Sequence, residues 1–375
     1  MIISIPKEIL PGENRVACTP DVASKLIKMG YEVHVQKGAG LNAGFNNEQY
    51  IKAGANVIEN AEQLFGSADL VLKVQKPEED EIKKMKKGSL LISFIYALHY
   101  PQIGKLCAQN GIDLIAMDMV PRTTLAQKMD ALSSQANIAG YKSVILAANH
   151  LGKIFPLMMT AAGTISPAKV VIMGAGVAGL QALGTAKRLG AVVEVSDIRP
   201  SAKEEVQSLG GKFIEVETTE NMQDERGYAK EASEEFLKKQ KELIFKHVTE
   251  ADIVITTALV PGKKAPILVT EEMVKNMKPG SVVLDMAVEF GGNCEISEAG
   301  KTVKKYDVTI IGESNLPSLV PTHASEMYAK NLLALIQHIS KNGQLELKLE
   351  DEIVKGCLIS RNGEVINDRI KELLK

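Results

Sequence analysis

Residues 121–133 bring together four polar side chains that could hold a polar ligand: Arg122, Gln127, Asp130 and Ser133. An Ala-rich stretch with helical spacing follows them. Ser and Asp also cap helix N-termini, because their side-chain oxygens accept hydrogen bonds from the N–H groups of the first turn. The pattern therefore allows two interpretations, a helix cap and a binding loop.

A glycine-rich turn is the strongest local motif of the chain. Gly174, Gly176 and Gly179 follow the apolar run 170–173 and open a helical segment. The first glycine permits a tight turn, the second lets the backbone approach a pyrophosphate, and the third allows close helix packing. The helix N-terminus favours the phosphate charge. Asp197 ends the next apolar run, 23 residues after Gly174, where a carboxylate can accept hydrogen bonds from an adenosine ribose. The order of these features predicts a dinucleotide site.

Two further residues bear on this site. Arg199 could attract the 2′-phosphate of NADP, but Asp197 would repel it, so the sequence favours NAD. The segment TTALVPGKKAP, residues 256–266, follows a predicted strand at the edge where open α/β sheets bind ligands. Leu259 could line the cofactor crevice there, and a simple Pro-Gly turn is an equally good interpretation.

The residues needed for other chemistry are scarce. A dehydrogenase that acts alone needs a general acid or base near the nicotinamide, most often a histidine. Of the six histidines only His99, just beyond the predicted strand 90–95, has a suitable place, and a capping or surface role explains it as well. We find no metal-ligand spacing, no nucleophile elbow and no Walker-type phosphate loop.

Short β-branched runs alternate with helical patterns, which is typical of parallel strands joined by crossover helices. The expected strands are 2–5, 31–35, 70–74, 90–95 and 113–117 in a first series, and 170–173, 192–196, 212–216, 252–257, 281–286 and 308–312 in a second. We predict an α/β protein with two doubly wound Rossmann-like domains on parallel sheets, the second inserted into the first. The first domain would comprise 1–132 and 322–375, and the second 133–321.

Two connections interrupt this pattern. The segment 217–251 is a polar stretch followed by a charged helical pattern, and it is longer than a crossover needs. It suits a solvated helix with a surface loop, or a mobile lid in which Gly227 is the hinge and Tyr228 the tip. Near the C-terminus, Asn362-Gly363 between alternating runs predicts a hairpin, which could form an interface arm or be a structural decoration.

Composition limits the partners. The chain has 44 Lys and Arg against 46 Asp and Glu with no long block of one sign, so we expect no nucleic-acid partner. The four cysteines are scattered, which suits a reducing cytosol. No apolar run is long enough to span a bilayer, so we expect no direct membrane insertion and any membrane contact would be made through another chain.

Several segments resemble the NAD(H)-binding domain I of proton-translocating NAD(P) transhydrogenase. They include IPKEILPGENRVACTPDVASKL, PRTTLAQKMDALSSQANIAGYKSV, VVIMGAGVAGLQALGTAKRLGAVV and TTALVPGKKAPILVTEEMVKNMKPGSVVLDMAVEFGGNC. The related alanine dehydrogenases share the region around Arg15 and the KVxxP pattern. The chain departs from them in two places: Tyr96 stands where they carry their catalytic histidine, and Glu289 stands where they have an aspartate.

The resemblance implies roles for particular residues. Those that would hold the nicotinamide and its ribose, and meet an NADP-binding partner, are Arg122, Gln127, Asp130 and Ser133. Those that would surround the rest of the cofactor are Gly174, Gly176, Val177 and Gly179 at the pyrophosphate, Asp197, Ile198 and Arg199 at the adenosine, and Gly227, Tyr228, Gln240 and Leu259 around the pocket. No metal is implied. Hydride would pass directly from NADH to NADP⁺ on the partner, so that no general base is needed.

The resemblance also implies an assembly. Proton translocation requires membrane-spanning and NADP-binding subunits, so we expect a separately encoded soluble α subunit. It would be a homodimer, cytoplasmic and attached peripherally to the inner membrane through its partners. Two alternatives stay open: a stand-alone NAD-dependent oxidoreductase of the alanine dehydrogenase type, and a non-catalytic NAD-binding module.

Overall fold

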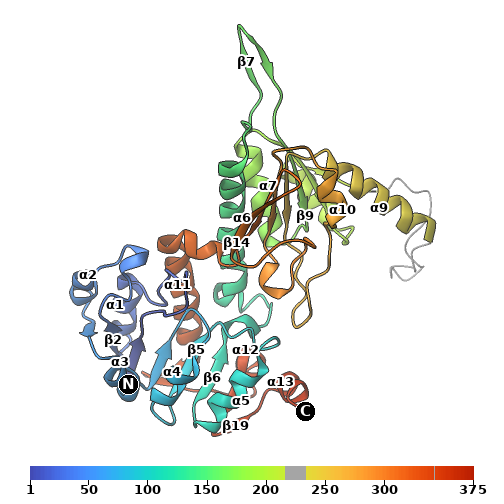
Figure 1. Ribbon diagram of the computed structural model, residues 1–375. Coiled ribbons are helices and arrows are strands. Elements are labelled where there is room, and N and C mark those ends of the chain that lie inside the picture. The colour runs from blue at the N-terminus through green and yellow to red at the C-terminus, as the bar shows by residue number, and fades with distance from the viewer. Residues whose placement is uncertain (216–233, 342) are drawn as a thin grey trace. The chain divides into compact units, whose positions relative to one another are not determined.

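The chain divides into two compact α/β units, shown in Figure 1, a ribbon diagram of the computed structural model. The structure describes residues 1–215, 234–341 and 343–375. One unit comprises Met1–Ala136 and Pro317–Lys375, and the other comprises Asn137–Leu316. The second unit is thus inserted in the sequence of the first.

The first unit is built on an eight-stranded sheet with the order β19-β18-β6-β5-β4-β1-β2-β3. Strands β1 to β6 are parallel, whereas β18 runs antiparallel to β6, and β19 antiparallel to β18. The strands are β1 (Ile2–Ile5), β2 (Glu32–Gln36), β3 (Asn56–Ile58), β4 (Leu70–Leu72), β5 (Leu90–Ser93), β6 (Asp113–Ala116), β18 (Leu358–Arg361) and β19 (Glu364–Val365). A two-stranded sheet, β16 (Ser340–Lys341) with β17 (Gln344–Leu345), is separate from it.

The helices of this unit begin where the sequence supplies caps. Thr19 accepts the N–H of Val22 and Pro20 occupies the first turn of α1, where a missing N–H is tolerated. The helices are α1 (Pro20–Lys28), α2 (Asn47–Lys52), α3 (Ala61–Ser67), α4 (Glu79–Lys84), α5 (Pro101–Gln109), α11 (Pro321–Ile339), α12 (Glu352–Cys357) and α13 (Asp368–Leu373). The predicted hairpin is confirmed between β18 and β19, because Asn362 and Gly363 both adopt positive φ, at 51° and 85°.

The second unit has a seven-stranded sheet with the order β11-β10-β9-β12-β13-β15-β14. All neighbours are parallel except β14 and β15. The strands are β9 (Lys169–Met173), β10 (Val192–Ser196), β11 (Lys212–Phe213), β12 (Ile253–Thr256), β13 (Val282–Asp285), β14 (Lys301–Lys305) and β15 (Val308–Gly312). The helices are α7 (Val177–Arg188), α8 (Ala202–Ser208), α9 (Glu234–Thr249) and α10 (Glu271–Lys275), while α6 (Ala131–His150) contains the division between the units. These two predominantly parallel sheets confirm the predicted fold class.

Period-two alternation along the strands gives the second sheet a core on each face. On β9, Val170 and Ile172 join one apolar cluster, and Val171 and Met173 join another. Helix α7 covers the first cluster with small residues such as Ala182, and α9 packs its apolar side chains against the second. The glycine turn that follows β9 is therefore anchored on a strand that is buried on both faces.

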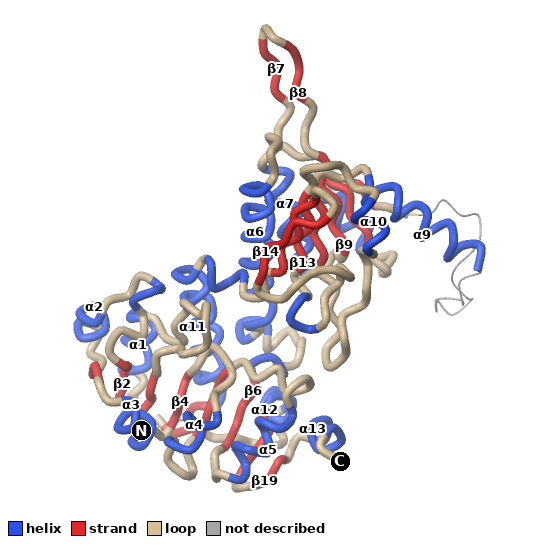
Figure 2. The backbone as a smooth tube through the Cα atoms, in the orientation of Figure 1, coloured by secondary structure: helices blue, strands red, loops and turns tan. Residues whose placement is uncertain are grey.

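A hairpin of two short strands, β7 (Met158–Thr160) and β8 (Gly163–Ile165), projects from the second unit (Figures 1 and 2). The sequence patterns did not predict this element. Its apolar side chains are exposed, and Met159 is 77% accessible. Exposed apolar groups gathered on one projection are typical of a surface that meets another chain.

The described part of the chain holds neither a membrane-spanning helix nor a metal cluster. None of the helices in residues 1–215, 234–341 and 343–375 is long and apolar enough to cross a membrane. Across the same residues, no group of three or more His, Cys, Asp or Glu side chains is arranged to hold a metal ion.

Candidate functional site

The glycine turn lies at the carboxyl end of β9, between β10 and β12. This is the point at which the strand order of the second sheet reverses, and ligands of open α/β sheets bind at such points. Gly174 has a φ of 109°, which a residue with a side chain rarely adopts. Gly176 is the N-cap of α7 with no side-chain cap, and a Cβ there would meet no atom within 4 Å. The second glycine thus leaves open space at a helix N-terminus, which is what a pyrophosphate requires.

The other two glycines make close approaches inside the protein. A Cβ at Gly174 would lie 2.5 Å from Thr257 Oγ1, and one at Gly179 would lie 1.9 Å from the carbonyl oxygen of Gly174. Thr257, the first residue after β12, donates its hydroxyl hydrogen bond to the Gly174 carbonyl at 3.1 Å. The glycine turn is thus hydrogen-bonded to the end of the neighbouring strand β12. The TTALVPG segment was predicted to lie at this edge, but its sequence did not single out Thr257.

Asp197 follows β10 and binds the glycine turn directly. Its Oδ2 accepts the N–H of Ala175 at 2.6 Å, and its Oδ1 accepts the N–H and Nε of Arg199 at 2.8 and 3.0 Å. The guanidinium of Arg199 also donates to the carbonyl of Ala175 at 3.1 Å. Burial alone would raise the pKa of the Asp197 carboxyl, but hydrogen bonds from Arg199 and Ala175 outweigh it and lower that pKa. Arg199 is therefore held by a carboxylate, which weakens its attraction for a 2′-phosphate.

The remaining predicted cofactor residues occupy different places in this unit. Val177 begins α7, and Ile198, between Asp197 and Arg199, is 93% exposed. Leu259 is about half exposed in the loop after β12, and Gln240 is half-buried on α9. Gly227 and Tyr228, the hinge and tip of the proposed lid, lie outside the described residues, whereas the helical pattern that follows them forms α9. The structure thus gathers the three glycines, Asp197 and Arg199 around one turn.

The loop 121–133 belongs to the first unit and follows β6. Asp130 caps α6: its two carboxylate oxygens accept the N–H of Ser133 at 2.9 Å and the hydroxyl of Ser133 at 2.6 Å. The helix-cap interpretation is therefore confirmed for Asp130, and Ser133 is the first-turn residue that it binds. Arg122 and Gln127 are exposed, and Gln127 opens a short 3-10 helix, Gln127–Met129.

A buried asparagine anchors this loop from beneath. Asn331 on α11 donates to the carbonyl of Lys128 at 2.9 Å and accepts the hydroxyl of Ser134 at 2.6 Å. Ala126 and Met129 are buried and add apolar anchoring. The exposed side chains of Arg122 and Gln127 thus project from a backbone that is fixed on both sides. No spacing signal in the sequence connects Asn331 with this loop.

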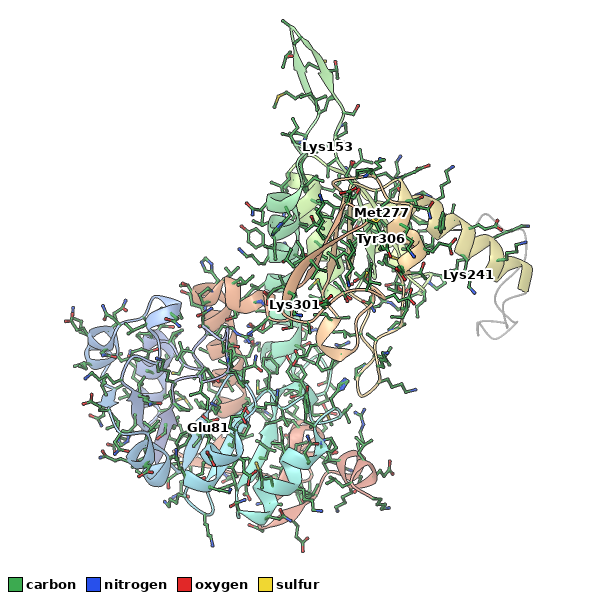
Figure 3. The ribbon with its side chains drawn as sticks, in the orientation of Figure 1. Glu81, Lys153, Lys241, Met277, Lys301 and Tyr306 are labelled. Atoms are coloured by element: carbon green, nitrogen blue, oxygen red, sulfur yellow. The ribbon has the colours of Figure 1, made fainter. Side chains whose placement is uncertain are left out.

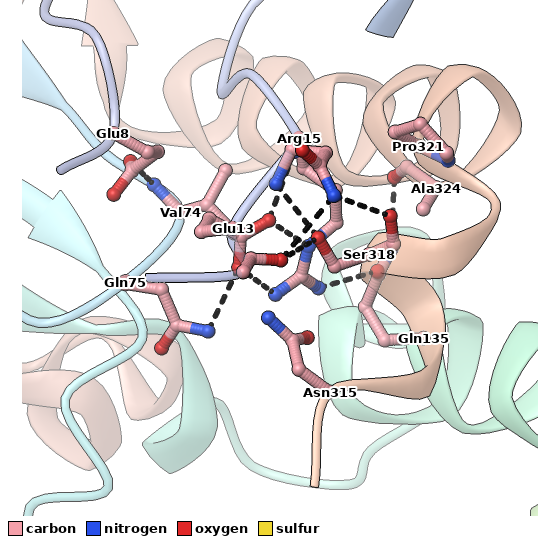
Figure 4. A network of polar contacts seen from close by, with 12 residues as sticks. Glu8, Glu13, Arg15, Val74, Gln75, Gln135, Asn315, Ser318, Pro321 and Ala324 are labelled. Atoms are coloured by element: carbon pink, nitrogen blue, oxygen red, sulfur yellow. Dashed lines mark hydrogen bonds and ion pairs between the residues drawn. The ribbon is translucent and has the colours of Figure 1, made fainter. Parts of the chain in front are cut away.

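Arg15 lies in a buried polar network of the first unit (Figure 4). Its guanidinium donates to both oxygens of Glu13, at 2.8 and 2.6 Å, and to Oε1 of Gln135 at 2.8 Å. Gln75 donates to Glu13 at 2.9 Å. Arg15 is only 4% exposed, and its charge is matched by Glu13.

A second buried cation, Lys73, lies beyond β4. Its ammonium contacts Glu81 of α4, labelled in Figure 3, at 2.8 Å and Glu8 at 3.3 Å. Burial alone would lower the pKa of Lys73, but the two carboxylates outweigh it and raise that pKa, so the lysine stays charged. Burial raises the pKa of Glu8. Lys73, like Arg15, is neutralised by internal partners.

The proposed acid or base, His99, lies in the turn after β5. The backbone N–H of His99 donates to the carbonyl of Tyr96 at 2.8 Å, and Tyr96 adopts a φ of 53°. The ring of Tyr96 stacks on Phe94 with centroids 5.8 Å apart. The turn is therefore held by a backbone hydrogen bond and by the stacking of Tyr96 on Phe94.

A glycine turn, an acidic residue after the second strand and a reversal of strand order define a protein of the two-unit, Rossmann-like class. Residues 4–139 match the family described as "Alanine dehydrogenase/PNT, N-terminal domain", and residues 143–368 match "Alanine dehydrogenase/PNT, C-terminal domain". The chain belongs to the alanine dehydrogenase/PNT family.

Relatives from both branches of this family resemble the chain. It is 50% identical over 376 residues to the first part of NAD(P) transhydrogenase subunit alpha of Rhodospirillum rubrum, which covers 98% of each chain. It is 30% identical over 380 residues to the alanine dehydrogenase of Bacillus subtilis, covering 99% of this chain and 94% of the relative. The transhydrogenase structure from Sinorhizobium meliloti superposes with a TM-score of 0.89 at 44% identity, covering 98% of this chain and 100% of the other. The resemblance inferred from the sequence is confirmed.

Proposed function

We propose that this chain is the NAD(H)-binding component of a proton-translocating NAD(P) transhydrogenase. In this reaction NADH gives a hydride directly to NADP⁺ that is held by a partner domain. The observation that carries the proposal is the glycine turn closed by Asp197, in a chain similar over nearly its whole length to a transhydrogenase subunit. Proton translocation would belong to a membrane-spanning partner.

The protein's own residues would bind and orient. The N-terminus of α7 with Gly176 would hold the pyrophosphate, because its N–H groups and open space favour an anion. Asp197 would disfavour a 2′-phosphate and so select NAD(H). Arg122, Gln127 and the Asp130–Ser133 pair would hold the nicotinamide and its ribose. Direct transfer needs positioning of the reacting carbons within roughly 3–3.5 Å and no general base.

Tyr96 favours this reaction over amino-acid oxidation. An enzyme that oxidises alanine without a partner must present a cation to the substrate carboxylate and a base to its amine. Arg15 and Lys73 lie in segments that the alanine dehydrogenases share, and in this chain both are paired with carboxylates, so they do not separate the two reactions. Tyr96 replaces the histidine of the alanine dehydrogenases. We therefore rank the stand-alone dehydrogenase second and the non-catalytic NAD-binding module third.

We further propose a homodimer, with NADP-binding and membrane-spanning subunits as its other partners and a cytoplasmic, peripheral location. The support for self-association is the hairpin β7–β8, whose exposed apolar side chains suit an interface better than the short β18–β19 hairpin does. A Met159→Lys variant should shift the mass measured by light scattering towards the monomer. An unchanged mass would exclude the hairpin from the interface.

The central test is a reconstituted reaction. The purified chain is mixed with an NADP-binding transhydrogenase domain and an NADP⁺ analogue whose reduced form absorbs at a distinct wavelength. NADH should reduce the analogue only when both proteins are present, and the related Rhodospirillum rubrum subunit provides the positive control for the partner. Production of NADH from L-alanine and NAD⁺ by the chain alone would favour the dehydrogenase. NADH binding without turnover, unchanged in Asp130→Asn, would favour the non-catalytic module.

A further inference from the structure

Asn293 is a fully buried asparagine whose side chain joins the two ends of one loop. Its Oδ1 accepts the N–H of Ala258 at 3.0 Å, and its Nδ2 donates to the carbonyls of Ala258 at 2.9 Å and Pro266 at 2.8 Å. Its own carbonyl accepts the N–H groups of Leu268 and Val269. The amide thus uses both donors and its acceptor on backbone groups, and only one orientation of the amide satisfies all three contacts.

Asn293 is itself held by the carboxylate at the end of β13. Oδ2 of Asp285 accepts the N–H groups of Asn293 and Cys294, each at 2.9 Å, and the hydroxyl of Ser297 at 2.6 Å. Oδ1 of Asp285 accepts the hydroxyl of Thr256, the last residue of β12. Asp285 is buried, so these donors compensate for its desolvation. The backbone that carries Asn293 is therefore rigidly tied to the sheet.

The tied loop, residues 258–266, starts beside the glycine turn. Thr257, which directly precedes it, contacts the carbonyl of Gly174. Residues 259–264 are exposed, and Leu259 is 49% accessible. Because both ends of the loop meet the Asn293 side chain, this one side chain limits the positions that Leu259 can take next to the turn.

We propose that Asn293 is a positioning residue for NADH: it closes the loop 258–266 and holds Leu259 at the edge of the dinucleotide site. The inference rests on the proposed function, because it takes the glycine turn as the pyrophosphate site. Asn293 acts through the loop and touches no reacting atom. Losing its two N–H donors should loosen the loop and weaken NADH binding while hydride transfer from bound NADH is preserved.

The test is Asn293→Asp, which has nearly the same shape but places a carboxylate oxygen against the carbonyls of Ala258 and Pro266. The matched control is Asn276→Asp at the exposed C-terminal end of α10, where the amide donates to the helix carbonyl of Glu272 at 2.9 Å. NADH dissociation constants are measured by fluorescence, and trypsin cleavage after Lys263 and Lys264 reports the loop. We expect Asn293→Asp to weaken NADH binding about 10- to 100-fold and to accelerate this cleavage, with kcat at saturating NADH little changed.

Separate results would overturn the proposal. Equal NADH affinity in Asn293→Asp and Asn276→Asp would show that the loop does not position the cofactor. If NADH binding by Asn293→Asp falls only in proportion to the fraction of unfolded protein, the role of Asn293 is purely structural. If Asn293→Asp does not fold, hydrogen exchange of the wild-type chain decides: NADH should slow exchange in 258–266, and unchanged exchange there would refute the proposal. Failure of the wild-type chain to bind NADH at all would refute the proposed function instead.

Discussion

The three glycines of the turn are expected to fail in different ways when a methyl group is added, and Gly176→Ala is the most informative change. Gly176 has a φ of −73°, which alanine adopts without strain, and its Cβ would meet no protein atom within 4 Å. The free energy of unfolding should therefore change by less than about 1 kcal/mol, because the small gain from a stiffer unfolded chain is offset by a weaker N-cap.

The same methyl group would occupy the space in which a pyrophosphate approaches the backbone. A methyl group that intrudes on a closely packed ligand should reduce its binding free energy by about 1–3 kcal/mol, which is the cost of inserting a group of similar size into a packed protein core. Since 1.4 kcal/mol corresponds to a factor of ten, the NADH dissociation constant should rise roughly 5- to 150-fold. The variant should thus lose cofactor binding while it keeps its fold.

Gly179→Ala is the matched contrast. Its Cβ would lie 1.9 Å from the Gly174 carbonyl oxygen, so the backbone of the turn must move by at least about 1 Å. In a unit of this size, the melting temperature should fall by about 2–4 °C for each kcal/mol of unfolding free energy that the substitution removes. Both variants are measured by NADH fluorescence titration and thermal unfolding. If Gly176→Ala binds NADH as tightly as the wild type, the pyrophosphate does not lie at this turn and the assignment of the dinucleotide site is wrong.

Three other predictions test the charges and the exposed loop. Asp197→Asn should release Arg199 and remove a negative charge, so the preference for NADH over NADPH should fall about tenfold in competition titrations, and an unchanged ratio would contradict this. For Glu194, burial would raise the pKa, but hydrogen bonds from His247 and Lys169 outweigh it and lower the pKa. Its stabilising effect is thus present above about pH 4.3 and lost as the pH falls through the folded-state pKa. Urea unfolding should show Glu194→Gln less stable than wild type by about 1–3 kcal/mol at pH 7 and less so at pH 4, whereas a constant difference would refute the linkage. Gln127→Ala should reduce hydride transfer far more than NADH affinity, and equal losses would mean that Gln127 only binds.

The parallel sheets could be predicted because buried strands are continuous β-branched runs. The strands that escaped prediction lack this pattern. Strand β14 reads KTVKK and is largely exposed, so its pairing with β15 comes from tertiary contacts. Strand β7 has three exposed residues, and its apolar sequence resembles a buried segment. Local sequence does not distinguish an apolar strand in a core from one on a projection.

Part of the site could be predicted from the sequence, because at some positions the backbone geometry allows only one residue type. Gly174 and Gly179 are glycines because a Cβ would collide with nearby atoms, and this requirement is visible in the spacing. Asn293 and Asn331 were not predictable, since each amide bonds backbone groups that are distant in the sequence, and no local pattern marks that requirement. The pairing of Arg199 with Asp197 likewise needed coordinates.

The two sheets of the protein use the same topological position in opposite ways. Each contains six strands in the order typical of dinucleotide-binding domains, and the order reverses at β1 and β4 in one sheet and at β9 and β12 in the other. In the second sheet this point carries the glycine turn and Thr257. In the first, Glu8 follows β1 and accepts the N–H of Val74 beyond β4 at 2.6 Å.

This contact closes the reversal point of the first sheet. Glu8 also contacts Lys73, so a buried ion pair lies at the place where the second sheet leaves open space at Gly176. Buried charges at that point need bonding partners to offset the loss of water. Lys73 contacts Glu81, and Glu8 accepts the N–H of Val74. The reversal point of the second unit is therefore open for the dinucleotide of the proposed function, whereas the corresponding point of the first is occupied by its own side chains. That unit carries the fixed loop with Arg122 and Gln127 instead.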